Sequence, residues 1–362
     1  MSKQDKIALI MAGGTGGHVF PALAVAEALR DKGVKVHWLG TRSGIESRIV
    51  PEAGFSISYI NIKGLRGNGM ARWVLAPFKI LFATMHAMKI CLNIKPNFVL
   101  GMGGFVTWPG GVASRLLGRP LLIHEQNAIP GLTNKLLGKI ASRILIAFPH
   151  AFKTNKSVYF TGNPVRKSIL GIEKPEKRYT SRKTSIRILV AGGSLGAQAL
   201  NEVVPGAMAM INAEHKVEVW HQAGKQKLAS TISKYKSENI KANVVEFIDD
   251  MDEAYQWADI VICRSGAMTV AEISNVGIAS LLVPYPYAVD DHQTANAKYL
   301  SEANAALLIQ QNELTATRLA DELQNLLNLG REHLLAMANR ALKLGRPDAT
   351  TVIVQHCMEV SL

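Results

Sequence analysis

The sequence predicts an α/β protein built from two doubly wound parallel-sheet domains. Three observations support this prediction. Strand-like apolar segments alternate with helix-like segments along most of the chain, as in parallel sheets covered on both faces. A strand, a glycine-rich turn and a helix follow one another at Gly13 and again at Gly192, 179 residues later, which is about one domain length. The 362 residues also exceed the size at which single cores usually stop growing.

In the first half, the expected strands have apolar centres and are followed by glycine or polar residues. They are KIALIMAGG, KVHWLG, NFVLGMGG and PLLIHEQ, and a helix is expected over 21–30, after the first of them. The stretch 171–185 is polar, charged and proline-containing, which predicts a linker. Beyond it, IRILVAGGSLGAQAL repeats the strand, turn and helix. Further strands are expected in KVEVWHQAG, ANVVEFID, DIVICRSG and ASLLVPYP, and helices over 314–327 and 331–345.

The composition is that of a folded protein, with 48% hydrophobic and 19% charged residues. The three cysteines, Cys91, Cys263 and Cys357, lack metal-binding spacing and favour a reducing compartment, where they pack as small apolar groups. The apolar run near the N-terminus passes directly into glycines, so we interpret it as a strand and not as a signal peptide. No stretch has the length and composition of a membrane-spanning helix.

Positive charge is concentrated in the first half of the chain. Residues 1–163 contain 20 Lys and Arg against 6 Asp and Glu, whereas residues 164–362 contain 21 against 22. Such an asymmetry indicates that the first half meets an anionic partner: nucleic acid, a phospholipid surface or a phosphorylated substrate.

The first glycine turn, MAGGTGGHVF, matches neither standard nucleotide-binding fingerprint. A dinucleotide site requires a third glycine where Val19 stands and an acid after the second strand, where LGTR stands. A P-loop requires a lysine, which the turn lacks. Glycines before a helix N-terminus still suit a phosphate group, although a tight turn without a ligand is an equal alternative for one copy. The second copy, Gly192-Gly193-Ser194, favours the ligand-binding interpretation.

Eight motifs in order carry a resemblance to a known family: GGTGGHVFPALAVAEAL, GMGGFVTWPGG, HEQNAIPGLTNK, GNPVR, GGSLGAQALN, EFIDDM, CRSGAMTVAE and DDHQTANA. Together they resemble the bacterial UDP-N-acetylglucosamine:undecaprenyl-pyrophosphoryl-MurNAc-pentapeptide N-acetylglucosaminyltransferases of glycosyltransferase family 28. The resemblance runs from about Lys6 to the last helix. It implies the glycosyltransferase B fold, with two Rossmann-like domains facing across a cleft. It places residues 1–163 and a helix at about 345–362 in an acceptor- and membrane-binding domain, and residues 164–344 in a UDP-GlcNAc-binding domain.

The resemblance also implies how the donor, UDP-GlcNAc, is bound. Ser194 and Arg166 would contact the diphosphate, the backbone of Ile248 the uracil, and Glu272 the ribose hydroxyls. Gln293 would touch the sugar. The remaining donor-side or substrate-closing positions are Thr15, Gly16, Gly17, Asn127, Ala267, Met268, Thr269, Val270 and Ala271. Leu195 and the length of the loop 285–291 depart from the family pattern, so a side-chain contact at Leu195 is not carried over and a role for His292 is not assigned.

Two residues are candidates for the general base that an inverting transfer needs. His18 starts a helix, whose positive end disfavours the charged imidazole and leaves the ring ready to accept a proton. Glu125 in HEQN ends a strand in an acid-poor half of the chain. The motifs leave both open, with a slight preference for His18.

No metal or other cofactor is expected. The triplet Asp250-Met251-Asp252 spells the D-x-D metal motif of another glycosyltransferase class, but it precedes a helix, where aspartates cap free N–H groups.

The acceptor in this family is lipid I, undecaprenyl-pyrophosphoryl-MurNAc-pentapeptide, which stays in the membrane. The segment 71–92 offers apolar and cationic side chains to an anionic phospholipid surface, although some of them must belong to the core. The candidates are Trp73, Leu75, Phe78, Lys79 and Phe82. The turn with Gly103 and Gly104 could form a pyrophosphate cradle with the turn at Gly14.

The resulting hypothesis is a peripheral enzyme on the cytoplasmic side of the inner membrane that converts lipid I to lipid II. Cell-wall synthesis and division proteins are further candidate partners, and nucleic acid is not expected. Three alternatives are weighed against it: a UDP-GlcNAc 2-epimerase of the same fold, a nucleotide-dependent oxidoreductase and a non-catalytic sugar-nucleotide sensor. The basic first half and apolar segment disfavour the epimerase, and the broken fingerprint disfavours the oxidoreductase.

Overall fold

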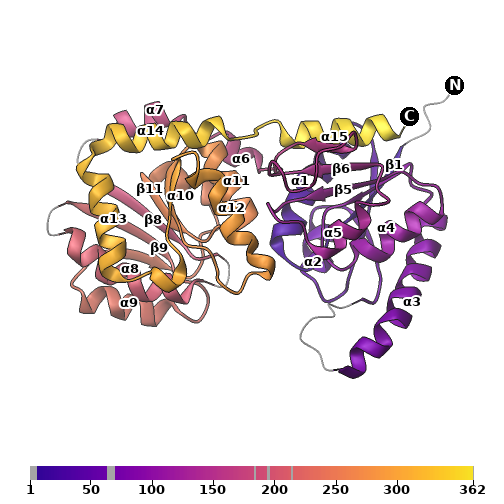
Figure 1. The fold of residues 1–362 in the computed structure, drawn as a ribbon, viewed down its shortest axis with the longest axis horizontal. Helices are drawn as coiled ribbons and strands as arrows, with labels where there is room; N and C mark the ends of the chain where they lie inside the picture. The colour runs from indigo at the N-terminus through magenta and orange to yellow at the C-terminus, as the bar shows by residue number, and fades with distance from the viewer. Residues whose placement is uncertain (1–5, 63–69, 183–184, 194–195, 213–214, 362) are drawn as a thin grey trace. The chain divides into compact units, whose positions relative to one another are not determined.

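The computed structural model describes residues 6–62, 70–182, 185–193, 196–212 and 215–361, with the backbone alone described for 70–76 and 212. The chain divides into two compact units (Figure 1). Unit 1 comprises Met1–Val165 and Pro347–Leu362, and unit 2 comprises Arg166–Arg346. Each unit is a parallel sheet with helices, so the predicted fold class is confirmed.

Unit 1 contains a seven-stranded sheet in the order β3-β2-β1-β4-β5-β6-β7, and every pair is parallel. Its strands are β1 Ile7–Met11, β2 Lys35–Gly40, β3 Ser56–Tyr59, β4 Phe98–Gly101, β5 Leu121–Glu125, β6 Arg143–Ile146 and β7 Val158–Phe160. Its helices are α1 Gly16–Asp31, α2 Glu46–Glu52, α3 Met70–Ile94, α4 Thr107–Leu116, α5 Leu132–Leu137 and α15 Ala349–Val360.

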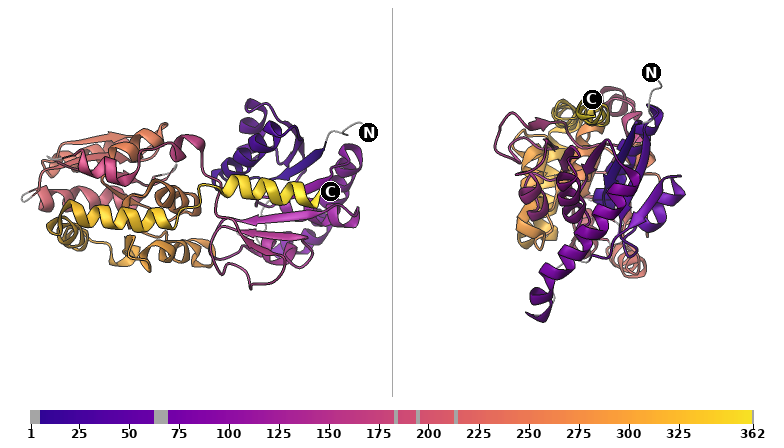
Figure 2. Two further views of the ribbon diagram at one scale, coloured as in Figure 1. Left: turned by 90° about the horizontal axis from the view of Figure 1, so that it is seen from above. Right: turned by 90° about the vertical axis from the view of Figure 1, so that its right-hand side faces the viewer.

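The central strand β1 is buried on both faces, which explains its continuous apolar sequence. Successive side chains of a strand point to opposite faces. Ala8 and Ile10 therefore join one apolar core with α1 and α15, while Leu9 and Met11 join another with α3 and α4. Helix α15, the end of the chain, thus packs beside α1 in unit 1 (Figures 1 and 2).

Unit 2 contains a six-stranded sheet in the order β10-β9-β8-β11-β12-β13, again with every pair parallel. Its strands are β8 Ile186–Ala191, β9 Val217–Gln222, β10 Ala242–Val245, β11 Ile260–Cys263, β12 Ala279–Leu282 and β13 Ala306–Leu308. Its α-helices are α6 Lys167–Leu170, α7 Pro175–Thr180, α8 Gln198–Asn212, α9 Leu228–Ser237, α10 Met251–Trp257, α11 Ala267–Val276, α12 His292–Ser301, α13 Ala316–Asn328 and α14 Gly330–Lys343, and its 3₁₀ turns are η1 Val289–Asp291 and η2 Gln311–Glu313.

The prediction of a linker over 171–185 was wrong. The segment contains α7, which packs against α14, and both Arg178 and Tyr179 are buried. The guanidinium of Arg178 donates to the carbonyl oxygens of Tyr255 at 3.3 Å and Val276 at 2.9 Å. The last carbonyls of a helix lack partners within that helix. Arg178 of α7 therefore supplies hydrogen-bond donors to the buried end of α11, which a hydrophobic residue could not do.

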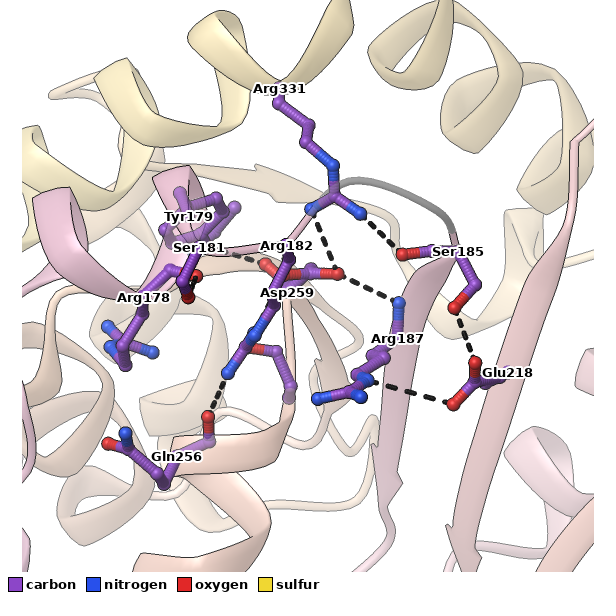
Figure 3. Close-up of polar contacts among 12 residues, drawn as sticks. Arg178, Tyr179, Ser181, Arg182, Ser185, Arg187, Glu218, Gln256, Asp259 and Arg331 are labelled. Atoms are coloured by element: carbon purple, nitrogen blue, oxygen red, sulfur yellow. Dashed lines mark hydrogen bonds and ion pairs between the residues drawn. The ribbon is translucent and has the colours of Figure 1, made fainter.

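A buried carboxylate fixes this segment to the sheet of unit 2 (Figure 3). Asp259 is fully buried, and its Oδ1 accepts a hydrogen bond from Nη1 of Arg182 at 2.7 Å. Its Oδ2 accepts from the backbone N–H of Arg187 in β8 at 3.0 Å, and Nη1 of Arg331 in α14 lies 3.2 Å from it. One side chain at the start of β11 therefore joins the end of α7, β8 and α14.

We predict that Asp259→Ala destabilises unit 2 by about 3 kcal/mol, because it leaves two partly buried arginines without their buried carboxylate partner. Urea denaturation and hydrogen exchange of β8 and β11 peptides would measure the loss. Glu322→Ala is the control, since its pair with Arg318 lies on the surface of α13 and is worth at most about 0.5 kcal/mol. Equal losses in the two variants would contradict the prediction.

Candidate functional site

The first glycine turn connects β1 to α1 as the sequence predicts. Gly14 has a φ of 92°, a conformation that side chains disfavour, and Thr15 takes the N-cap position with an extended backbone. Gly16 and Gly17 open α1, and His18 lies in its first turn. Gly14, Thr15 and Gly17 are exposed, so the start of α1 is accessible from solvent.

The loops that follow β4 and β5 lie close to this turn. In the parallel sheet, β4 is next to β1 and β5 is next to β4. The N–H of Gly13 donates to the carbonyl of Gly103 after β4, at 3.3 Å. A Cβ on Gly103 would collide with Nδ1 of His18, and a Cβ on Gly104 would collide with the carbonyl of Gly13. The glycines after β4 therefore allow close approach to the first turn and to the His18 ring.

A chain of side-chain hydrogen bonds runs from His18 into the core of unit 1. Nδ1 of His18 lies 3.2 Å from Oε1 of Gln126, which is buried. Nε2 of Gln126 donates to the carbonyl of Met102 at 2.8 Å and lies 3.2 Å from Nδ1 of His124. Nε2 of His124 lies 3.0 Å from the carbonyl of Gly162. Burial lowers the pKa of His124 to about 4, so this ring is neutral at pH 7.

Glu125 is buried, and both of its carboxylate oxygens accept hydrogen bonds. Oε1 accepts from the backbone N–H of Asn127 at 3.0 Å and from its side-chain amide at 3.3 Å. Oε2 accepts from the N–H of Gly131 at 3.1 Å and from Nδ2 of Asn134 at 2.8 Å. In this structure, Glu125 therefore shapes the loop that follows β5.

A cavity of about 190 Å³ lies beside the first turn, lined by Gly13, Gly14, Thr41, Ser43, Gly44, Ile62, Phe105 and Val106. Under it, the buried carboxylate of Glu46 accepts from the N–H of Gly14 at 3.0 Å and from the N–H and hydroxyl of Thr41 at 2.9 and 2.7 Å. Residues of the first glycine turn and of the turn after β4 therefore line the same cavity. The carboxylate of Glu46 fixes the position of the Gly14 amide.

In unit 2, a buried glutamine ties the second glycine turn to the segment after β10. Nε2 of Gln222 donates to the carbonyl of Gly193 at 2.8 Å, and its Oε1 accepts from the N–H of Ile248 at 3.0 Å. The Ile248 side chain is buried, so the backbone is what this residue can present to a ligand. Ser194 and Leu195 lie outside the described residues.

Helix α11 begins after the extended N-cap residue Gly266. The side chains of Ala267, Val270 and Ala271 are buried, while those of Met268 and Thr269 are half-buried. This packing directs the first-turn side chains into the protein and leaves backbone N–H groups as the feature suited to an anion.

Glu272 lies in the second turn of α11 and carries an unusual set of partners. Its Oε2 accepts from the hydroxyl of Tyr255 at 3.1 Å, and its Oε1 lies 3.3 Å from Nη2 of Arg166. The side chain of Glu272 is 14% exposed and that of Arg166 is 45% exposed. Burial raises the pKa of Glu272, and Arg166 and the Tyr255 hydroxyl oppose this shift in part. Glu272 is therefore not a solvated surface residue.

The loop before α12 is fixed by its own polar groups. Oε1 of Gln293 accepts from the N–H of Tyr285 at 2.9 Å, and the carbonyl of Gln293 accepts from Oγ of Ser265 at 2.8 Å. Nδ1 of His292 lies 2.7 Å from the carbonyl of Val289. Gln293 is thereby held close to the start of α11, through Ser265.

The side chain of Asp250 makes no capping hydrogen bond, although this residue is the N-cap of α10, so that part of the prediction was wrong. Asp252 lies in the first turn, where its charge suits the positive end of the helix. Among the residues that the structure describes, no group of three His, Cys, Asp or Glu side chains could hold a metal ion.

Helix α3 exposes a row of large apolar side chains: Phe78, Leu81, Phe82 and Met85, of which Phe82 is 67% exposed. Lys79 is exposed beside them, and Ala83 and Ala87 pack into the core on the opposite face. The side chains of Trp73 and Leu75 lie outside the described residues. Within the described parts of the chain, no helix has the length and hydropathy needed to cross a membrane.

Comparison with known proteins identifies the family. The glycosyltransferase family 28 N-terminal domain matches residues 8–146, and the family 28 C-terminal domain matches residues 187–353. A curated relative from Shewanella denitrificans is 50% identical over 358 residues, which cover 98% of this chain and 96% of the relative. The chain belongs to glycosyltransferase family 28.

Other members of family 28 agree with this assignment. The Shewanella relative and one from Nitrosococcus oceani, 48% identical over 98% of both chains, are named UDP-N-acetylglucosamine--N-acetylmuramyl-(pentapeptide) pyrophosphoryl-undecaprenol N-acetylglucosamine transferase. The crystal structure of Acinetobacter baumannii MurG has a TM-score of 0.86 and 41% identity, covering 98% of this chain and 99% of that one. A putative UDP-N-acetylglucosamine 2-epimerase from Listeria monocytogenes, at 15% identity and a TM-score of 0.71, shares the fold alone.

Four residues that organise these family 28 sites were not singled out from the sequence: Glu46, Gln126, Gln222 and Tyr255. Gln126 follows the buried strand β5, Gln222 ends the partly buried strand β9, and Tyr255 lies on the short helix α10. The position of a polar residue at a strand end was an available signal for the two glutamines. Glu46 bonds to Gly14, 32 residues away, and Tyr255 bonds to Glu272, 17 residues away, and no local pattern marks these contacts.

We predict that Glu272→Gln stabilises unit 2 at neutral pH, because the raised pKa means that the ionised carboxylate costs folding free energy. Below the unfolded-state value of 4.5 both states are protonated, and above it the unfolded state ionises first. The wild type should therefore lose stability relative to the variant as the pH rises from about 4 to about 7. Urea midpoints across this range would test it, with Glu322→Gln on α13 as the control. A difference between wild type and Glu272→Gln that does not change with pH would refute the assignment.

Proposed function

We propose that this chain transfers GlcNAc from UDP-GlcNAc to the C4 hydroxyl of MurNAc in lipid I, with inversion, and so forms lipid II for peptidoglycan synthesis. The observation that carries the proposal is the full-length similarity to relatives whose names state this N-acetylglucosamine transfer, at 50% identity over 98% of the chain. The fold neighbours with epimerase names share only about 15% of the sequence, which gives that alternative no support beyond the fold.

Unit 2 supplies the donor site in this proposal. The N-terminus of α11 and Ser194 receive the diphosphate, and the Ile248 backbone receives the uracil. Glu272 accepts hydrogen bonds from the ribose hydroxyls. The raised pKa of Glu272 supports this role. Its ionised carboxylate destabilises the folded protein, and such a destabilising group is expected at a site that binds a ligand. Arg166, whose side chain is 45% exposed, balances the negative charge that UDP gains as it leaves. Gln293 contacts the sugar.

Unit 1 supplies the acceptor site, with His18 as the general base. The acceptor oxygen forms a bond to the anomeric carbon, the bond from that carbon to the UDP oxygen breaks, and the hydroxyl proton passes to His18. The start of α1 disfavours the protonated imidazole, which keeps the base available. Glu125 is the weaker candidate, because four hydrogen bonds already engage its two oxygens. The acceptor side is shaped by the first glycine turn, the turn after β4 and the loop after β5, with the residues Thr15, Gly16, Gly17, Gly103, Gly104 and Asn127.

We predict that His18→Ala lowers the transfer rate by about 10²–10⁴-fold while UDP-GlcNAc binding is unchanged. Transfer of radiolabelled GlcNAc to a lipid I analogue would measure the rate, and calorimetry would measure donor binding. Transfer should persist in EDTA. Glu125→Gln tests whether Glu125 is the base instead. If this variant loses transfer while His18→Ala retains it, Glu125 and not His18 is the general base. Absence of any lipid II-like product from the wild type would overturn the proposed function.

We further propose that α3 docks unit 1 on the cytoplasmic face of the inner membrane as a peripheral contact. The exposed apolar row of α3 suits the interface between acyl chains and head groups, and Lys79 and Lys89 on the same helix suit anionic phospholipids. The excess of 20 Lys and Arg over 6 Asp and Glu in residues 1–163 acts in the same direction.

We predict that the double change Phe78→Ser and Phe82→Ser weakens binding to phosphatidylglycerol-containing vesicles by about tenfold or more, because two exposed rings no longer enter the interface. Vesicle sedimentation would measure it, and added salt should weaken the binding of wild type. Leu329→Ser is the matched control, since Leu329 is 60% exposed but belongs to unit 2. Equal binding by the double variant and wild type would place the membrane contact elsewhere.

A further inference from the structure

The buried amide of Gln126 has only one orientation that satisfies its neighbours. The carbonyl oxygen of Met102 can only accept a hydrogen bond, and it lies 2.8 Å from Nε2 of Gln126. A flipped amide would place two acceptor oxygens against each other in a buried site, at a cost of about 1–3 kcal/mol. Oε1 of Gln126 must therefore face the imidazole of His18.

This orientation determines which nitrogen of His18 carries the proton. An amide oxygen can only accept, and it lies 3.2 Å from Nδ1 of His18. Nδ1 must therefore be the protonated nitrogen. In a neutral imidazole, the lone pair then belongs to Nε2, on the other side of the ring.

The second N–H of the Gln126 amide is accounted for in the same way. It points to Nδ1 of His124, 3.2 Å away, while Nε2 of His124 lies 3.0 Å from the carbonyl of Gly162 and must be protonated. Nδ1 of His124 is then an acceptor, in agreement with the neutral state that burial imposes on this ring. In this series of hydrogen bonds from His18 to Gly162, every donor faces an acceptor. The position of each proton in the series is therefore determined.

We propose that Gln126 is a positioning residue that holds His18 in the tautomer with the proton on Nδ1 and the lone pair on Nε2, ready to take the acceptor hydroxyl proton. This inference rests on the proposed function, in which His18 is the base. An amide orients the ring without adding negative charge. A carboxylate at this position would favour the imidazolium, and a protonated ring cannot act as a base.

The surroundings of His18 are compatible with this role. The turn after β4, Met102 to Val106, brings no titratable side chain to the ring, and the close approach of Gly103 limits where the imidazole can move. The end of β5 brings His124 and Glu125, and the carboxylate oxygens of Glu125 accept hydrogen bonds from Asn127, Gly131 and Asn134. The first turn itself contacts Glu46 through Gly14.

The first test reads the tautomer directly. In wild type labelled with ¹⁵N-histidine, we expect His18 to show a protonated Nδ1 and an unprotonated Nε2 in long-range ¹H–¹⁵N spectra. Gln126→Met should mix the two tautomers and lower kcat by about tenfold or more, with the KM for UDP-GlcNAc unchanged. Gln355→Met, an exposed glutamine on α15 in the same unit, should change neither.

The second test uses Gln126→Glu, which keeps an acceptor for Nδ1–H but adds a charge. The His18 tautomer should be retained, and the carboxylate should raise the pKa of His18. Because the base must be unprotonated, the acidic limb of the kcat–pH profile should move to higher pH. A residue with a purely structural role would not move this limb.

The outcomes separate this proposal from the proposed function. An active wild type whose His18 nitrogen shifts are unchanged by Gln126→Met would overturn the positioning role alone. If Gln126→Met does not fold, Gln126→Glu decides, and an unmoved acidic limb would overturn the role. A folded wild type without transfer to lipid I would overturn the proposed function and, with it, the role of Gln126.

Discussion

Unit 1 depends on the order of its strands, because parallel strands deliver the loops that follow them to one edge of the sheet. With β1 beside β4, and β4 beside β5, the first glycine turn, the turn at Gly103 and the segment containing Gln126 meet at that edge. Side chains at Gly103 or Gly104 would keep these loops apart. The position of His18, its contact with Gln126 and the cavity beside Gly13 all follow from this arrangement.

Unit 2 uses the same constraint with different chemistry. The strands β9, β8 and β11 are adjacent, so the glycine turn after β8, Gln222 at the end of β9 and the start of α11 after β11 share one edge of the sheet. Here a glutamine again bridges two loops, but the helix α11 offers backbone N–H groups and a largely buried carboxylate in place of an imidazole. In the proposed function, the repeated fold thus carries the proton acceptor in one copy and the sugar-nucleotide site in the other.

Sequence patterns predicted the features that depend on local apolar periodicity. The strands around 7–11, 98–101 and 260–263 are continuous apolar runs because both faces of each sheet are covered, and the turn and helix after each run follow from glycine placement. The linker prediction over 171–185 failed because a charged segment was expected to be solvated, whereas Arg178 and Arg182 serve buried carbonyls and Asp259. The partners of Gln126 and Glu272 depend on strand order and helix packing, which no local window of sequence contains.

Unit 1 is formed by two separate segments of the chain, which affects the order in which the units can fold during synthesis. Ile353, Val354 and Cys357 of α15 complete the apolar core against α1, although more than 300 residues separate the two helices. Unit 2 is continuous in sequence and has all of its core residues once Arg346 has been synthesised. Unit 1, although its strands precede unit 2 in the sequence, has an open apolar face until α15 emerges. Synthesis order and folding order are therefore expected to differ, and a chain shortened by its last turns would expose α1 while leaving unit 2 intact.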